Sequence, residues 1–143
     1  MTFYDLPHDW HARALTDPTL AADVVDLVVR ESDREGGCLA LLMCDASGRM
    51  VQPVVLTEMQ QCPPDQRRDT LDICLGGVAD ALGAVVVAVG RPRGCVPDNE
   101  ARAWHEAVIA GCRAHEVTLL GTYLATPHAV VEMPLWPGLA ATA

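Results

Sequence analysis

The sequence predicts one α/β domain in which a mixed β-sheet is flanked by helices. Short runs of apolar and β-branched residues alternate with longer stretches whose apolar residues recur at helical spacing. With 143 residues, half of them hydrophobic, the chain is long enough for one domain with a substantial core. The expected order is α-β-β-α-β-α-β-β. We assign residues 1–16 to an irregular N-terminal segment, 17–134 to the domain and 135–143 to a tail.

The first helix is expected over residues 17–34. Asp17 can cap this helix, and Pro18 fits its first turn, where the missing backbone N–H costs nothing. Gly36 and Gly37 follow and favour its end. The apolar residues fall on one face of the helix: Leu20, Val24, Leu27 and Val28.

Two strands joined by a tight turn are expected next. "CLALLMCD" (38–45) is an apolar run of strand length, "DASG" is typical of a turn, and "RMVQPVVLT" (49–57) returns as the second strand. Pro53 cannot donate a hydrogen bond to a neighbouring strand. We therefore expect this second strand at a sheet edge, or bulged at the proline.

The remaining chain alternates helices and strands. A helix is expected over 65–82, although Gly76 and Gly77 weaken it unless close packing uses their missing side chains. The β-branched run over 84–89 predicts the central strand, buried on both faces. If the strands on either side of the helix pair in parallel, their crossover should be right-handed.

A further helix is expected over 98–115, capped by Asp98, with one apolar stripe that includes Trp104. "VTLLGTYLA" (117–125) and "AVVEMP" (129–134) predict two closing strands.

The charge and cysteine content narrow the class of protein. A net charge of −9 argues against binding to nucleic acid or to an anionic membrane surface, because both need basic patches. Six cysteines without a C-x-x-C pair, and no signal-peptide pattern at the start, favour free thiols in a reducing compartment. We therefore expect a cytoplasmic protein without disulfides.

Common catalytic templates are missing from the sequence. It contains no G-x-S-x-G, P-loop or H-E-x-x-H pattern. His8 and His11 have a ligand-like spacing but lie in a weakly helical segment, so a solvated pair is the simpler interpretation. His105 and Glu106 are most simply explained as part of a polar helix face.

From about Cys38 to Pro134, the chain resembles the RadC-like branch of the JAB/MPN metalloprotease-like domains. "CLALLMCDASGRMVQPVVL" resembles the opening hairpin of that branch, and "DICLGGVADALGAVVVAVGRPRG" resembles its helix and central strand leading into a His-x-His-Pro-Ser-Gly loop. "PDNEARAWHEAVIAGCRAHEVTLLGTYLATPHAVVEMP" resembles the following helix and closing strands. The resemblance implies a JAB/MPN fold, which is cytidine-deaminase-like.

The resemblance also implies where a zinc site would lie. Active members bind zinc through two loop histidines and an aspartate of the next helix, leaving a position open for water. By the resemblance, the histidines correspond to Val89 and Arg91, and the aspartate to Ala101, with one residue deleted from the loop. The family's upstream glutamate falls near Gly37, and the serine after the loop proline falls at Arg93. An inactive domain without a metal or other cofactor is therefore expected.

Several alternatives remain open from the sequence. A small shift of the alignment could bring Glu35 into the glutamate's position, and Asp98 or Glu100 into the aspartate's, as part of a rearranged metal site of a hydrolase. Cys95, close to two arginines, could instead serve a thiol-based enzyme. The expected role is binding, to an unidentified protein partner or a small anionic ligand, and a homodimer is also open.

The strand–loop–helix junction offers one candidate ligand site. Arg91 and Arg93 lie in a stretch without acidic residues, and Asp98 begins the next helix. Such a place suits a carboxylate or phosphate. The simpler interpretation, which we favour, is that these arginines pair with Asp98, Glu100 or another surface acid.

Overall fold

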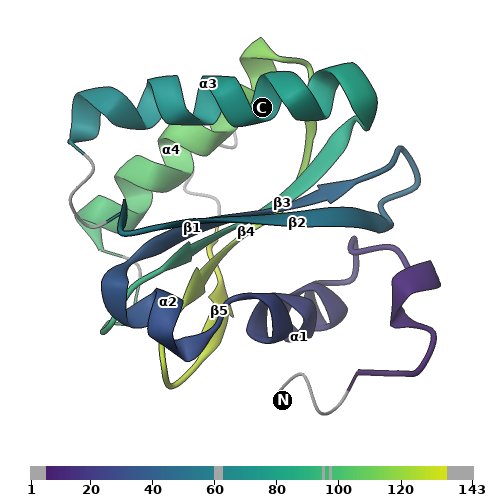
Figure 1. Cartoon of the computed structure of the whole chain (residues 1–143), viewed down its shortest axis with the longest axis horizontal. Helices are drawn as coiled ribbons and strands as arrows, with labels where there is room; N and C mark the ends of the chain where they lie inside the picture. Colours follow the sequence, from purple (N-terminus) through teal and green to yellow (C-terminus); the bar gives the residue numbers. More distant parts are fainter. Residues whose placement is uncertain (1–5, 60–62, 95, 97, 135–143) are drawn as a thin grey trace.

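The computed structural model describes residues 6–59, 63–94, 96 and 98–134. A five-stranded sheet lies between two helical layers (Figure 1). Helices α3 (Pro64–Ala81) and α4 (Asn99–Ala114) cover one face, while α1 (Pro18–Val28) and α2 (Glu31–Gly36) lie against the other. The predicted α/β class, with a mixed sheet flanked by helices, is confirmed.

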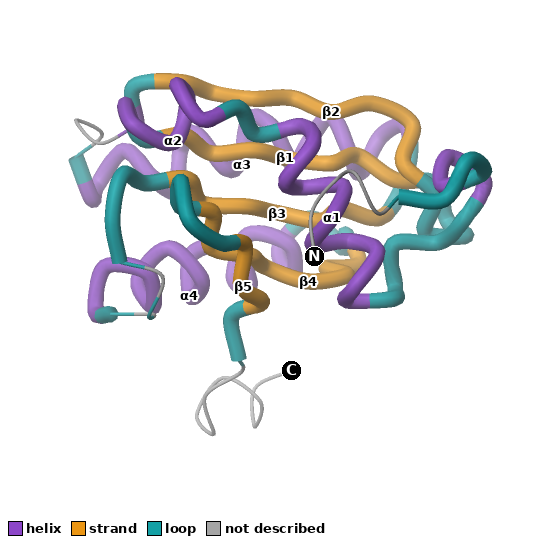
Figure 2. Tube along the Cα trace, turned by 90° about the horizontal axis from the view of Figure 1, so that it is seen from below, coloured by secondary structure: helices purple, strands orange, loops and turns teal. Residues whose placement is uncertain are grey.

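The strand order in the sheet is β2-β1-β3-β4-β5 (Figure 2). β3 and β4 are parallel neighbours joined through α4, while β1 pairs antiparallel with both β2 and β3, and β5 with β4. The strands before and after α3 are not neighbours, because β1 lies between them. The strand bounds are Cys38–Cys44 for β1, Met50–Thr57 for β2, Ala84–Gly90 for β3, Thr118–Ala125 for β4 and Val130–Glu132 for β5.

The central position of β3 follows from its sequence, as predicted. All seven residues of this strand are buried. Val85 and Val87 face the cluster under α3 and α4, whereas Val86 and Ala88 face the cluster under α1. A strand with helices on both sides has no polar face, which explains its continuous apolar run. β2, which carries Pro53, lies at the sheet edge, also as predicted.

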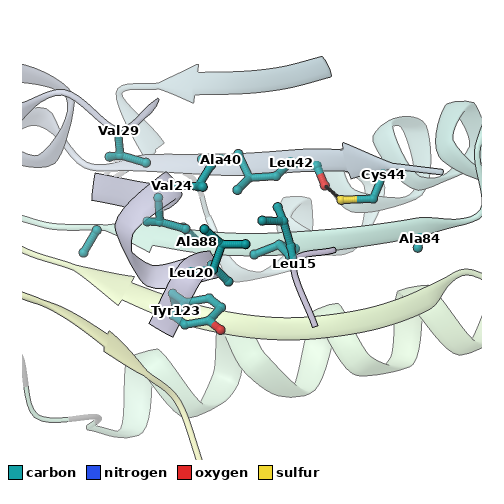
Figure 3. Packing of buried hydrophobic residues seen from close by; sticks show 14 of the residues in the cluster. Leu15, Leu20, Val24, Val29, Ala40, Leu42, Cys44, Ala84, Ala88 and Tyr123 are labelled. Atoms are coloured by element: carbon teal, nitrogen blue, oxygen red, sulfur yellow. Dashed lines mark hydrogen bonds between the residues drawn. The ribbon is translucent and has the colours of Figure 1, made fainter. Parts of the chain in front are cut away.

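The core under α1 joins helix and strand residues from distant parts of the chain (Figure 3). Leu20 and Val24 of α1 lie over the alternate residues of β1 and β3 that face this side. Tyr123 of β4 and Leu15, which precedes α1, complete the layer. The described part of the N-terminal segment is largely irregular, with one short 3-10 helix at Trp10–Ala12, and it still packs on the core through Leu15.

The prediction of one helix over 17–34 is wrong, because the helix breaks at Val29 and Arg30. Both residues have extended backbones, and α2 begins afterwards. Arg34 of α2 is buried, and its Nη2 donates to the carbonyl (3.2 Å) and the carboxylate (3.1 Å) of Asp26. The end of a helix leaves such carbonyls without a partner. Arg34 Nη1 also donates to the Thr126 carbonyl at 2.8 Å, so the break lets one arginine join α1, α2 and the β4–β5 turn.

Helix α3 continues through Gly76 and Gly77. A Cβ added to Gly77 would meet no atom within 4 Å, and one added to Gly76 would meet only the His115 ring, at 3.9 Å. Close packing therefore does not require either glycine. The tight contact between α3 and α4 lies at Gly111, where an added Cβ would come within 2.8 Å of Leu75 Cδ1.

Candidate functional site

A pocket of about 360 Å³ opens at the carboxyl end of the central strand β3. The start of β1 and the first turns of α4 form its other sides. Because β3 runs antiparallel to β1 and is followed directly by the loop to α4, these three chain segments must meet at this edge of the sheet. The lining residues are Gly37, Cys38, Met59, Val89, Gly90, Arg91, Pro92, Arg93, Glu100, Ala101 and Trp104.

Four positions singled out by the resemblance line this same pocket. They are Val89, Arg91 and Ala101, which the resemblance would match to the two histidines and the aspartate, and Gly37, near which it would put the glutamate. Residues 37 and 101 are far apart in sequence, so chance local spacing does not bring them together. Glu100 also lines the pocket, whereas Glu35 and Asp98 do not belong to its lining.

The side chains at these four positions do not fit a zinc ion. Gly37 has no side chain, and Val89 and Ala101 present only methyl groups. Arg91 remains protonated and has no lone pair for a metal. Within the described residues, no group of three or more histidine, cysteine or acidic side chains is placed to hold a metal.

Arg91 binds its own loop. Nη1 donates to the Asp98 carboxylate at 2.9 Å, Nη2 to the Val96 carbonyl at 2.9 Å, and both Nε and Nη2 to the Gly94 carbonyl. For Arg91, this is the pairing that the simpler interpretation expected; no such ion pair links Arg93 to another described residue. Most of the donor capacity of Arg91 is therefore used within residues 91–98.

The Asp98 carboxylate accepts hydrogen bonds from two neighbours. Its carboxylate accepts the Ala101 backbone N–H at 3.0 Å, which makes it the N-cap of α4 as predicted, and it also pairs with Arg91. The hydrogen bond from Ala101, followed by that from Arg91, holds the pKa of the Asp98 carboxyl below its ordinary value. A carboxylate so engaged is a poor candidate for a rearranged metal site.

Arg93 differs from Arg91 in its contacts. It is exposed and has no hydrogen bond or ion pair with any other described residue. Glu100 is paired differently: its carboxylate lies 3.2 Å from Nη2 of Arg67 on α3. The sequence identified Arg93 as a site residue, but it did not indicate that Arg93, unlike Arg91, would have no partner among the described residues.

The wall residues Trp104 and Met59, and Arg67, which contacts Trp104, were not identified from the sequence as site residues. Trp104 is 4% exposed, and the Arg67 guanidinium lies 4.7 Å from its ring centroid, within the range of a cation–π contact. Met59 follows β2, and its backbone N–H donates to the Gly37 carbonyl at 3.0 Å, which holds it beside the pocket. No local pattern distinguishes these residues from ordinary core and loop residues.

Cys38 forms part of the pocket floor as a protonated thiol. Burial raises its pKa to about 11, and the nearby Asp33 adds to this effect. A Cβ on Gly90 would overlap the Cys38 sulfur, so a larger residue at the end of β3 would force the sulfur or the backbone to shift. Cys95, the candidate nucleophile of the thiol-enzyme hypothesis, lies outside the described residues.

His105 corrects one expectation from the sequence. It does not lie on a polar helix face: it is 2% exposed on α4, and burial lowers its pKa. The buried face of α4 is therefore wider than predicted, because the sheet and α3 both contact this helix, whereas Glu106 is exposed as expected.

The described cysteines are free thiols: Cys38, Cys44, Cys74 and Cys112. Cys62 and Cys95 lie outside the described residues.

Measured against the hydrocarbon core of a bilayer, each described helix is too short or too polar to cross it.

Comparison with known proteins finds no match for this chain among models of protein families, curated proteins or solved structures.

Proposed function

We propose that the chain is a catalytically inactive RadC-like JAB/MPN domain that acts through binding at the pocket beside β3. The observation that carries this proposal is the meeting of Gly37, Val89, Arg91 and Ala101 in one pocket. These positions were selected from the resemblance, and the fold brings them together. The side chains found there supply no metal ligand.

Electrostatics support the loss of the metal. A zinc ion beside the Arg91 guanidinium would place like charges a few ångströms apart, which costs several kcal/mol at an effective dielectric constant near 20. Neither Val89 nor Ala101 offers a lone pair or a negative charge to offset this repulsion. What is left of the site is a concave pocket, and pockets of this size bind small molecules or single side chains of a partner.

The proposed role is thus that of a cytoplasmic binding module without a cofactor. Its partner is a protein or a small anionic ligand, and a homodimer remains compatible with this role. The free charge of Arg93 and the apolar wall at Trp104 are the features with which a ligand would make contact.

Restoring the missing ligands tests the proposal. We expect the natural chain to bind no stoichiometric zinc, measured by elemental analysis after dialysis against zinc. The variant Val89→His/Arg91→His/Ala101→Asp should bind about one zinc per chain. The matched control is Val89→His/Arg93→His/Ala101→Asp, which keeps Arg91. It should bind no zinc, because residue 93 is not one of the ligand positions.

Two results would contradict the proposal. One is stoichiometric zinc on the natural chain that is lost in Glu35→Ala or Asp98→Ala, which would establish a rearranged metal site. The other is a triple variant that keeps its folded circular dichroism spectrum but binds no zinc, which would remove the assigned correspondence of positions.

A further inference from the structure

We propose that the pocket binds a small amphipathic anion, with an aromatic or branched aliphatic group against Trp104 and Met59 and a carboxylate at Arg93. This inference rests on the proposed function, because it names the ligand class of the same pocket. Three features of the pocket carry it: its apolar wall, its remaining charge and its size.

The apolar wall comes from both sides of the opening. Trp104 and Ala101 on α4, Val89 on β3 and Met59 after β2 all line the pocket. The Trp104 ring is fixed in orientation, because it is almost fully buried and contacts the Arg67 guanidinium. A rigid aromatic side chain beside a flexible methionine suits an apolar group, since methionine adapts to irregular shapes.

The remaining charge of the pocket is positive. The charged residues of its lining are Arg91, Arg93 and Glu100, and two of them are already paired, Arg91 with Asp98 and Glu100 with Arg67. Arg93 is the cation left over among the described residues. In a chain of net charge −9, an unpaired arginine on a pocket wall favours a ligand that brings its own negative charge.

The ligand must carry both an apolar group and a negative charge. Inorganic phosphate alone would leave the wall at Trp104 and Met59 uncovered, and a neutral apolar molecule would leave Arg93 without a partner. A volume of about 360 Å³ suits a small molecule that buries its apolar group and keeps its charged end at the opening.

Trp104 provides a direct readout of binding. The sequence contains three tryptophans, so the variant Trp10→Phe/Trp136→Phe leaves Trp104 as the only indole. Its fluorescence is titrated with 3-phenylpropionate, with 3-phenylpropanamide and with inorganic phosphate. We expect a saturable change with the carboxylate, binding of the amide weaker by about tenfold, and no change with phosphate at the same concentrations.

The role of Arg93 is tested in the same background. Arg93→Ala should weaken 3-phenylpropionate binding by about tenfold and leave amide binding unchanged. Arg113→Ala removes another exposed arginine, at the opposite end of α4, and should change the binding of neither compound. Saturation-transfer difference NMR on the natural chain measures the same binding without tryptophan replacements.

Three other results of these titrations would contradict the inference, each at a different point. Equal binding of acid and amide, or indifference to Arg93→Ala, would overturn the charged ligand class while the zinc experiment still decides the proposed function. Binding of phosphate alone would overturn the apolar part. If neither NMR nor fluorescence detects binding of 3-phenylpropionate, the inference is wrong, again without deciding the loss of zinc.

Discussion

The guanidinium of Arg91 and the carboxylate of Asp98 lie 2.9 Å apart and close the loop between β3 and α4. Arg91 extends from the end of the central strand, and Asp98 caps the next helix. Their pairing ties the strand end to the helix start, so the shape of the pocket rim depends on this contact. It also leaves Arg93 as the arginine of the loop that can meet a ligand.

Replacing Arg91 should destabilise the protein. Arg91→Ala removes the pair with Asp98 and the hydrogen bonds to the Gly94 and Val96 carbonyls. We expect the free energy of unfolding to fall by about 1–2 kcal/mol, because the pair is partly exposed and screened by water. Urea denaturation measures this. Arg93→Ala is the control and should stay within about 0.5 kcal/mol of the natural chain; equal losses would argue against the loop contacts.

The contribution of Asp98 should depend on pH. Its folded-state pKa lies below the ordinary value of 3.8, so ionised Asp98 stabilises the fold above that value. The stabilisation is lost as the pH falls through the folded-state pKa. Asp98→Asn keeps a capping side chain without the charge. Its stability deficit, from urea denaturation, should be constant between about pH 5 and 7 and shrink below pH 4; a deficit that grows on acidification would contradict this.

Gly90 and Cys38 should be energetically coupled. Gly90→Ala forces a methyl group into the Cys38 sulfur and should cost about 1–3 kcal/mol of stability. In the double variant Gly90→Ala/Cys38→Ala the sulfur is absent, so part of the lost stability should be recovered. A double-mutant cycle from denaturation curves measures the coupling. Strict additivity of the two substitutions would show that the sulfur is not what excludes the side chain.

Two helix glycines should respond differently to alanine. Gly77→Ala should stabilise the protein by about 0.4–1 kcal/mol, because nothing lies within 4 Å of the added methyl and alanine favours helix. Gly111→Ala gains the same propensity but pushes against Leu75, which is fully buried. We expect its thermal midpoint to lie below that of Gly77→Ala, and the reverse order would contradict the close helix contact.

Three buried thiols should resist modification in the native state. Burial raises the pKa of Cys38 and Cys44 to about 11 and that of Cys112 to about 12. At pH 8 they should remain unmodified by iodoacetamide until the protein unfolds, as read by peptide mass spectrometry. All six cysteines should react in denatured, unreduced protein. Fast native labelling of Cys112 would mean that the contact between α4 and the sheet opens readily.

The sequence by itself determined most of the secondary structure and the sheet centre. The β-branched run of β3 could only be a strand buried on both faces, and the capping residues Asp17 and Asp98 placed two helix starts correctly. These features depend on neighbours along the chain, so their physical cause is visible locally. The pairing of Arg91 with Asp98 was also accessible, because only a few residues separate the two.

The tertiary structure alone decided where the first helix breaks and what forms the pocket. Arg34 finds its partners in Asp26 and the distant Thr126, so local spacing predicted a continuous helix. Likewise, Met59 and Trp104 become pocket walls only when β2 and α4 meet the end of β3. The side chains of one segment are set by local periodicity, but their contacts depend on which distant segments the sheet order brings against them.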